Sequence, residues 1–175
     1  LADTMDDLED IREFCCNNSV DLKVNFMRRS LPIFKKIKGI LKDQVVTGTC
    51  DVVIGYSGDF ANNASHFIDL VLFWFPGAVK ICSGRFDKNE MISCDLEVGQ
   101  ALVSVRPNGI QSVTDHRISI SMDTGRFVFE QAGRKCDIYD VTDDPDFRGL
   151  QYYEKTQTIN TDYINFMSYV YMDLK

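Results

Sequence analysis

The sequence is poor in the features that mark several common classes of protein. Its most apolar stretch, "FIDLVLFWF" (residues 67–75), is interrupted by Asp69 and is much shorter than the roughly 18 residues of a membrane span. It has no C-x-x-C pair of the kind that binds zinc. Basic residues number 19 against 26 acidic ones, so the formal charge is −7 at pH 7. These absences argue against a membrane protein, a zinc protein and a nucleic-acid-binding protein.

The cysteines and the acidic loops also lack the spacing of a cross-linked or metal-binding protein. Cys15 and Cys16 are adjacent in a helix-like stretch, where their side chains diverge. The other four cysteines lie in strand-like segments, where a free cysteine behaves as a small hydrophobic residue. We therefore expect reduced thiols and a cytoplasmic protein. The acidic segment 140–147, "DVTDDPDF", lacks the glycine and glutamate of a calcium loop, so we expect no metal site.

Residues 1–43 have the alternation of an α/β protein. "DTMDDLEDIREFCCNNS" (3–19) has apolar residues at helical spacing and predicts an amphipathic helix. "VDLKVNFM" (20–27) predicts a short strand. "SLPIFKKIKGILKDQ" (30–44) predicts a second helix, with Ser30 as its cap and Pro32 in its first turn. The basic face of this helix (Lys35, Lys36 and Lys38) is typical of a solvated surface.

The pattern after residue 44 is that of an antiparallel sheet. One strand (45–56) and one helix (about 62–75) are followed by a series of alternating segments at 77–86, 91–98, 100–107, 116–123, 125–132, 134–141 and 149–159, and by a final helix at 162–175. The segments of this series are too close for crossover helices, so we expect antiparallel pairing. The sequence predicts an α+β fold, with a predominantly antiparallel β-sheet, helices packed on one face and a helix–strand–helix piece in front. Such a sheet leaves its other face for solvent or a partner.

The start of the helix near residue 62 carries polar side chains that are out of place in a buried element. Histidine occurs at only two positions, 66 and 116. Asn62 and His66 are four residues apart and share a helix face, and Asp69 follows three residues later. A histidine at such a helix start can exchange a proton near neutral pH. It can equally cap the helix by bonding a neighbouring loop, and the spacing leaves both readings open.

Three segments together resemble the glucose–fructose oxidoreductase/inositol dehydrogenase (Gfo/Idh/MocA) family. "NNASHFIDLVLFWFPGAVK" (62–80) resembles the family's "N-G-S-H-F-I-D-L-L…G" segment. "VNFMRRSLPIFKKIKGIL" (24–41) resembles its strand, double arginine and helix, and "LADTMDDLEDI" (1–11) resembles the text after its Glu-Lys-Pro signature. The matches occur in the family's order and cover residues 1 to about 85. The later strands fit the family's C-terminal sheet but carry no specific motif.

The resemblance implies an NAD(P)-dependent oxidoreductase that acts on a sugar or a nucleotide sugar. In this family an N-terminal Rossmann half binds NAD or NADP through a G-x-G-x-x-G turn, which is absent from this sequence. Residues 1–43 would then be the end of that half and its linking helix. Residues 44–175 would be the substrate-binding and dimerisation domain, forming a homo-oligomer through the open sheet face. We expect the isolated chain to be inactive and to hold no cofactor-binding residue of its own.

The resemblance also assigns roles to individual residues. His66 matches the family histidine proposed as the acid/base on the substrate hydroxyl, and Asn62 stands where many members have an aspartate. Asparagine can bond a sugar hydroxyl but cannot carry a proton. Arg28 and Arg29 match the double arginine, of which one would bind a substrate phosphate or carboxylate and the other would brace the domain junction. Structural ion pairs remain an alternative for both arginines.

Two further positions complete the interpretation. Tyr56 either lines the same cleft or simply packs, and His116, beside Asp115 at a strand start, is predicted at the surface. A second reading of the whole chain is a non-catalytic sugar-binding or assembly module on the same fold. Two features favour that reading: Asn62 stands in place of an aspartate, and the glycine-rich turn is missing.

Overall fold

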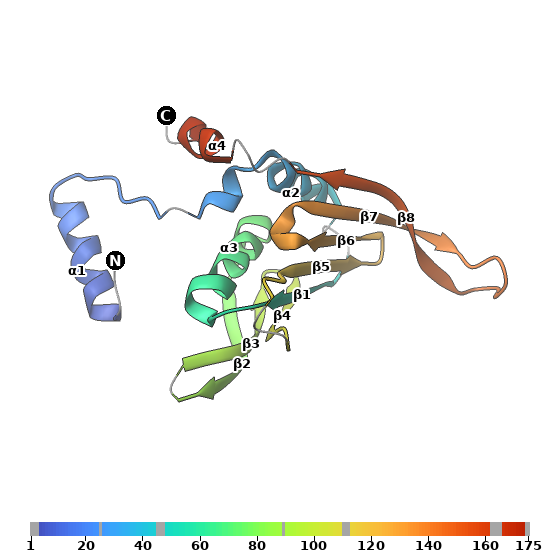
Figure 1. The fold of residues 1–175 in the computed structure, drawn as a ribbon, viewed down its shortest axis with the longest axis horizontal. Coiled ribbons are helices and arrows are strands. Elements are labelled where there is room, and N and C mark those ends of the chain that lie inside the picture. The colour runs from blue at the N-terminus through green and yellow to red at the C-terminus, as the bar shows by residue number, and fades with distance from the viewer. Residues whose placement is uncertain are drawn as a thin grey trace.

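The computed structural model describes residues 4–24, 26–44, 48–88, 90–109, 113–161 and 166–173. These residues form one mixed sheet of eight strands with helices beside it (Figure 1). The strands are β1 (Cys50–Tyr56), β2 (Val79–Asp87), β3 (Glu90–Val98), β4 (Ala101–Pro107), β5 (Arg117–Met122), β6 (Gly125–Glu130), β7 (Lys135–Asp143) and β8 (Gln151–Asn160). The predicted α+β class and the strands of the C-terminal series are confirmed.

The spatial order of the strands is β2-β3-β4-β1-β5-β6-β7-β8. Strand β1 thus lies in the middle of the sheet, parallel to β4 and antiparallel to β5. All the other pairs are antiparallel, as expected from their short connections. The β1–β4 pair is parallel because a helix and the β2–β3 hairpin lie between these strands in the sequence and return the chain in the same direction.

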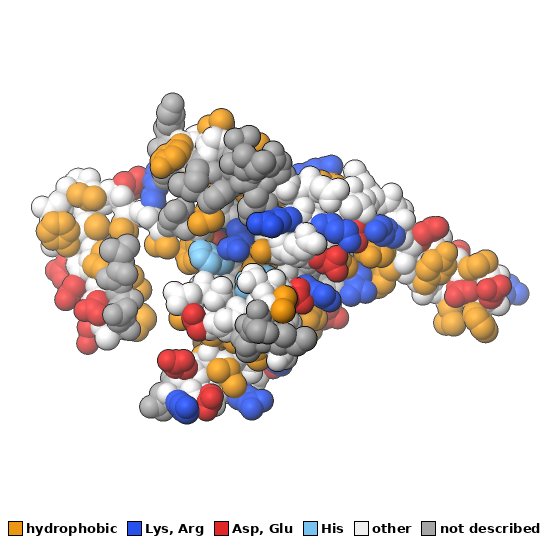
Figure 2. Space-filling view, in the orientation of Figure 1, with side chains coloured by type: hydrophobic (Ala, Val, Ile, Leu, Met, Phe, Trp, Pro, Cys, Tyr) orange, Lys and Arg blue, Asp and Glu red, His pale blue; other side chains and the backbone are white. Residues whose placement is uncertain are grey.

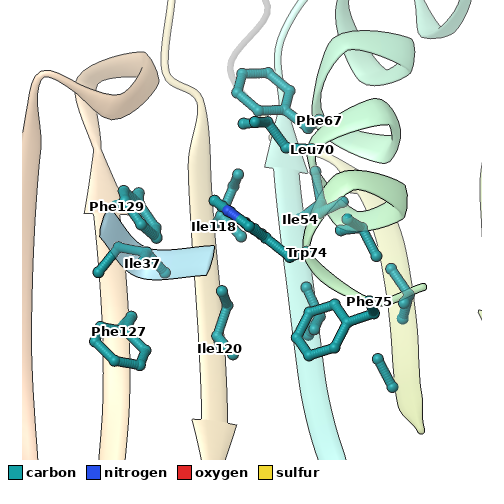
Figure 3. Packing of buried hydrophobic residues seen from close by; sticks show 14 of the residues in the cluster. Ile37, Ile54, Phe67, Leu70, Trp74, Phe75, Ile118, Ile120, Phe127 and Phe129 are labelled. Carbon is teal, nitrogen blue, oxygen red and sulfur yellow. The ribbon is translucent and has the colours of Figure 1, made fainter. Parts of the chain in front are cut away.

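Two helices cover one face of the sheet and bury the core. Helix α2 (Pro32–Gln44) begins at the predicted proline, while Ser30, predicted as its cap, lies in the preceding 3-10 turn. Helix α3 (Ser65–Trp74) packs beside α2. Figure 3 shows Trp74 of α3 and Ile37 of α2 over side chains that rise from β1, β5 and β6. The central strands β1 and β5 alternate buried and more exposed residues, which places one side chain in two against the helices.

Helix α1 (Met5–Asn17) stands apart from the sheet at the end of an extended segment (Figure 1). Thr4 and Asp7 form a reciprocal capping box at its start, which explains why the helix begins where the sequence predicts. The predicted apolar stripe is present, but it is uncovered: Met5 is 77% and Phe14 64% exposed. The helix is therefore held by its cap and its acidic first turn rather than by tertiary packing.

The prediction of a strand over residues 20–27 is wrong. Residues 20–24 and Phe26 have no strand structure, and Met27–Ser30 form the 3-10 helix η1. A strand needs a partner for its N–H and C=O groups, and here Phe26 N–H bonds back to Val24 O at 2.8 Å. Helix α4 (Phe166–Asp173), at the predicted C-terminal position, packs on η1, and its Asp173 pairs with Lys35 at 2.6 Å.

The division at residues 43 and 44 stays a prediction. That division places nearly all of helix α2 in the first part. Four residues of this helix nevertheless belong to the core against the sheet and are at most 5% exposed: Ile33, Phe34, Ile37 and Leu41. Helix α2 therefore folds with the sheet, whereas α1 contributes no buried residue.

The open face of the sheet carries two tight charge clusters. Asp95 accepts hydrogen bonds from Ser83 and Ser104, and its pKa falls to about 2 mainly because of these bonds. Asp137, bonded by Thr158 and paired with Lys135, also has its pKa lowered to about 2. The six cysteines are free, and no helix in the described part of the chain is long and apolar enough to cross a membrane.

Candidate functional site

One edge of the sheet gathers the ends of three strands. Because β1 and β4 are parallel, their carboxyl ends, Tyr56 and Pro107, are partners in the ladder. Strand β5 begins at the same edge, since it pairs antiparallel with β1. The loops are tied together there: Asn108 N–H donates to Tyr56 O at 2.6 Å, and Asp115 N–H donates to Ser57 Oγ at 2.9 Å. At this edge, therefore, the described ends of the loops after β1 and before β5 are held together by hydrogen bonds.

The chain enters α3 through a π-helical turn, Phe60–Ala64. Asp59 caps this turn: its carboxylate accepts from Asn62 N–H at 2.6 Å and from Asn62 Nδ2 at 3.0 Å, and these bonds lower the pKa of Asp59. The wider winding of a π turn shifts residues four apart away from a shared line. Asn62 is accordingly exposed while His66 is half-buried, and their joint contact with a substrate stays a prediction.

His66 lies on the first turn of α3 with one ring nitrogen closed off. Phe26 meets the imidazole edge to face at 5.5 Å and 86°. Nδ1 is buried, and no described residue hydrogen-bonds it. Burial lowers the pKa of His66, the charge of Arg28 lowers it further, and Asp69 acts in the opposite sense. The ring is therefore neutral at pH 7, and proton exchange with a ligand is left to Nε2.

Arg28 joins the two histidines of the chain into one cluster. Its guanidinium lies over the ring of Phe67 at 4.6 Å. Its charge is, after burial, the largest influence that lowers the pKa of both His66 and His116. Figure 2 shows histidine and basic side chains together near the middle of one face of the molecule. Burial thus lowers the pKa of both imidazoles, and the positive charge of Arg28 lowers both further.

The prediction that His116 lies at the surface is wrong. His116 is 6% exposed, its ring lies 5.1 Å from that of Phe67, and its Nδ1 accepts from Ser57 N–H at 3.3 Å. That hydrogen bond places the proton of the neutral ring on Nε2. The sequence alone does not predict this arrangement, because β5 pairs with β1, about sixty residues earlier, and not with its sequence neighbour β4. The scarcity of histidine was the one available signal.

Arg29 has a different environment from Arg28. Its Nε donates to Oδ2 of Asp69 at 2.6 Å, and its Nη2 reaches Oδ1 of the same carboxylate. Asp69 is 4% exposed, and burial raises its pKa although Arg29 lowers it. The bidentate pair fastens η1 to α3. The expected bracing of the domain junction by one of the two arginines stays a prediction. Direct binding of a substrate by Arg29 stays a prediction.

Tyr56 is nearly enclosed, with 2% of its surface exposed. Its hydroxyl donates to Ile92 O at 2.7 Å, and Phe60 meets its ring edge to face at 5.8 Å. Burial raises the pKa of the phenol. In this arrangement the hydroxyl is committed to the backbone of β3, and its predicted contact with a substrate stays a prediction.

A polar hollow of about 560 Å³ adjoins this cluster. Asp115, which lines the hollow, is the residue directly before His116 in the sequence. The lining consists mainly of amide, carboxylate, hydroxyl and guanidinium groups, from Asn108, Gly109, Val113, Thr114, Asp115, Arg117, Glu130 and Gln131. Gln131 and its neighbour Ala132 have φ of 52° and 59°, a conformation that costs free energy in non-glycine residues. Strained backbone of this kind is concentrated at functional sites.

The strand–helix turn of this site does not fit a dinucleotide. Dinucleotide sites leave a glycine-rich turn open so that a pyrophosphate can approach the backbone. Here Gly58, at φ 84°, is the one glycine between β1 and α3, and a Cβ on it would lie 2.5 Å from Nδ2 of Asn63. The side chain of Asn63 thus fills the turn. Nor does any group of three or more His, Cys, Asp or Glu among the described residues form a metal site.

Comparison with known proteins shows which solved structures share this fold. No protein-family model and no curated protein match the chain. Among solved structures, a dehydrogenase (MviM) from Clostridium difficile aligns with a TM-score of 0.64 and 18% identity over 97% of this chain and 55% of its own. A 3-ketoreductase from Actinomadura kijaniata in complex with NADP aligns at 0.64 and 10%, over 95% and 55% of the two chains.

A third structure is an inositol dehydrogenase homologue from Azotobacter vinelandii, complexed with NADH and myo-inositol. It aligns with a TM-score of 0.60 and 11% identity over 87% of this chain and 47% of its own. The chain thus spans about half the length of the structures it resembles. These are oxidoreductases of the Gfo/Idh/MocA type, and the chain has the fold of the parts that it matches.

Proposed function

We propose that this chain is the substrate-binding part of an NAD(P)-dependent oxidoreductase that acts on a sugar or a nucleotide sugar. The observation that carries the proposal is the cluster of His66, Arg28 and His116 at the carboxyl edge of β1 and β4. The fold shared with oxidoreductases supports it. NAD or NADP, when bound, supplies the hydride chemistry, and the filled turn at Gly58 implies that residues beyond this chain hold it.

The residues of this chain would handle the hydroxyl of the substrate. Oxidation of a secondary alcohol removes a hydride from carbon and a proton from oxygen. His66, neutral at pH 7, takes that proton at Nε2, and returns it in the reverse direction. Arg28 binds a carboxylate or phosphate of the substrate, and the polar hollow receives its hydroxyls. The exposed Asn62 offers its amide oxygen to one of these hydroxyls. Arg29 holds η1 in place through Asp69.

The second candidate function is a non-catalytic sugar-binding or assembly module. Asn62 favours this candidate, because it is an amide, bonded to Asp59, and not the carboxylate that a proton relay with His66 would need. The oxidoreductase and the sugar-binding module both predict that sugars bind at the same edge, whereas an assembly module does not. Only the first predicts turnover.

We further propose a cytoplasmic homo-oligomer that associates through the open sheet face. The six free thiols suit a reducing compartment. On the open face Val53 and Leu102 are 52% and 48% exposed, and they occupy neighbouring strands β1 and β4. A partner surface would cover these side chains.

Replacement of His66 by glutamine tests the catalytic proposal. The full-length protein that carries this chain is assayed with NAD and NADP against a panel of sugars and nucleotide sugars. We expect the variant to lose about 100-fold in kcat with little change in KM, since general acid–base catalysis contributes at least that much. Asn18→Ala, at the C-terminal cap of α1 and far from the site, is the control. Sugar binding without turnover in the parent would favour the module, and an unchanged kcat in the variant would exclude His66 as the base.

A further inference from the structure

The β7–β8 ribbon extends as an arm beyond the other strands (Figure 1), and its end is ordered. The acidic segment noted in the sequence lies at this end. Asp144 Oδ1 accepts from the backbone N–H groups of Asp146 and Phe147 at 2.9 and 3.0 Å, and Asp144 N–H donates to Leu150 O at 2.9 Å. These bonds fix the loop. We call residues 143–150 the arm tip.

The arm tip displays apolar side chains that are left uncovered by the residues the structure describes. Phe147 is 63% and Leu150 58% exposed. Figure 2 shows this end of the molecule as a group of hydrophobic side chains bordered by acidic ones. The tip contains three aspartates and one arginine, so it is acidic. An ordered loop that holds large apolar groups in water is preorganised for binding, because little conformational freedom remains to be lost.

A pocket of complementary character lies between the C-terminal ends of α2 and α3. It has a volume of about 540 Å³ and is lined by Lys38, Leu41, Lys42, Trp74, Phe75, Pro76, Gly99 and Gln100. We call it the basic pocket. Its floor consists of Leu41, Trp74 and Phe75, all buried in the core. The Lys38 ammonium lies 3.8 Å from the centre of the Phe73 ring. Among the described residues, neither Lys38 nor Lys42 has an acidic partner in an ion pair.

We propose that the arm tip of one copy of this chain docks in the basic pocket of a second copy. Phe147 and Leu150 would lie on the apolar floor, and Asp143 and Asp146 would face the two lysines at the rim. The charge match is notable in a chain of net charge −7, whose copies otherwise repel each other. The arm of the same chain points away from the sheet and its helices (Figure 1).

This contact joins different surfaces of the two copies and is separate from the open sheet face. A contact between unlike surfaces closes into a dimer when each arm reaches the other copy's pocket, and otherwise continues into larger assemblies. It also requires neither substrate nor cofactor. The inference is therefore independent of the proposed function.

Sedimentation velocity of the 175-residue chain over a range of concentrations tests the proposal. We expect a concentration-dependent association that Phe147→Ser with Leu150→Ser weakens at least about tenfold in Kd. Asp146→Lys and Lys42→Glu should each weaken it, and the two together should restore it in part, because the swapped charges attract again. Glu13→Lys on α1 changes the net charge as Asp146→Lys does and should leave it unchanged.

Three results would overturn the proposal. They are a parent chain that stays monomeric at the highest attainable concentration, a tip variant that associates like the parent, and a charge-swapped pair no better than its single variants. Circular dichroism of each variant establishes that it is folded; the tip residues are exposed, so their replacement should not disturb the sheet. Leu102→Ser, on the open face, separates the two contacts, since it should leave the tip-dependent association intact.

Discussion

Replacing Trp74 by alanine is expected to lower the free energy of unfolding by about 4 kcal/mol, since deletion of a buried tryptophan typically costs 3–5. Trp74 is 3% exposed and stacks on Phe129 with the ring centres 5.4 Å apart. Its Nε1 donates to Phe34 O at 3.0 Å, which joins α3 to α2. The alanine variant would leave a cavity and would lose the hydrogen bond that joins the two helices.

Trp74→Phe separates these two contributions. It keeps most of the ring contact with Phe129 but loses the hydrogen bond, so we expect a loss of about 1–2 kcal/mol. Urea denaturation followed by circular dichroism gives both values. A loss below about 1 kcal/mol for the alanine variant would show that the contact between the two helices and β6 does not hold the core together.

Replacing Arg29 by methionine is expected to cost about 2–3 kcal/mol at pH 7. The change leaves the carboxylate of Asp69 buried without its partner, and breaking a buried pair costs 3–5 kcal/mol. We take a smaller value because the Arg29 side chain is 43% exposed and solvent screens the pair. Urea denaturation at several pH values measures the effect.

The loss should depend on pH in a defined direction. Burial raises the pKa of Asp69, and Arg29 opposes that shift, so the pKa rises further in the variant. A folded-state pKa above the unfolded one makes the folded state lose stability as pH rises through that interval. The deficit of Arg29→Met should therefore be largest at neutral pH and shrink as the pH falls toward the ordinary value of an aspartate. Arg12→Met, which breaks the exposed pair with Glu9, is the control and should change little. An equal deficit at all pH values would contradict the account.

The sequence predicted the elements whose signal is local. Alternation identified strands such as β4, β5 and β6, in which every second side chain is buried. Strands β2 and β8 were predicted from the same alternation of residue types, although their side chains are almost all exposed. Alternation failed at residues 20–27, where valine and leucine alternate with polar residues but no strand is near enough to pair. The central place of β1 and its parallel pairing with β4 depend on contacts fifty residues apart and leave no local pattern.

The candidate site was predictable only in part for the same reason. The spacing around His66 indicated a helix start, which the structure has, but a π turn precedes it. Two adjacent arginines could not be told apart, because their roles follow from which one faces Asp69 and which one faces Phe67. His116 was missed since it reaches the cluster through the pairing of β5 with β1.

The central claim is that Arg28 and the two histidines form one site, and proton NMR titration of the imidazole signals tests it most directly. Removal of one histidine at a time assigns the two signals. We expect both pKa values to lie below the usual value for histidine. Arg28→Met should raise both, because a nearby positive charge disfavours the protonated ring. Arg106→Met, whose guanidinium pairs with Asp95 on the open face, should raise neither. If Arg28→Met moves one histidine or none, the residues do not form a single site.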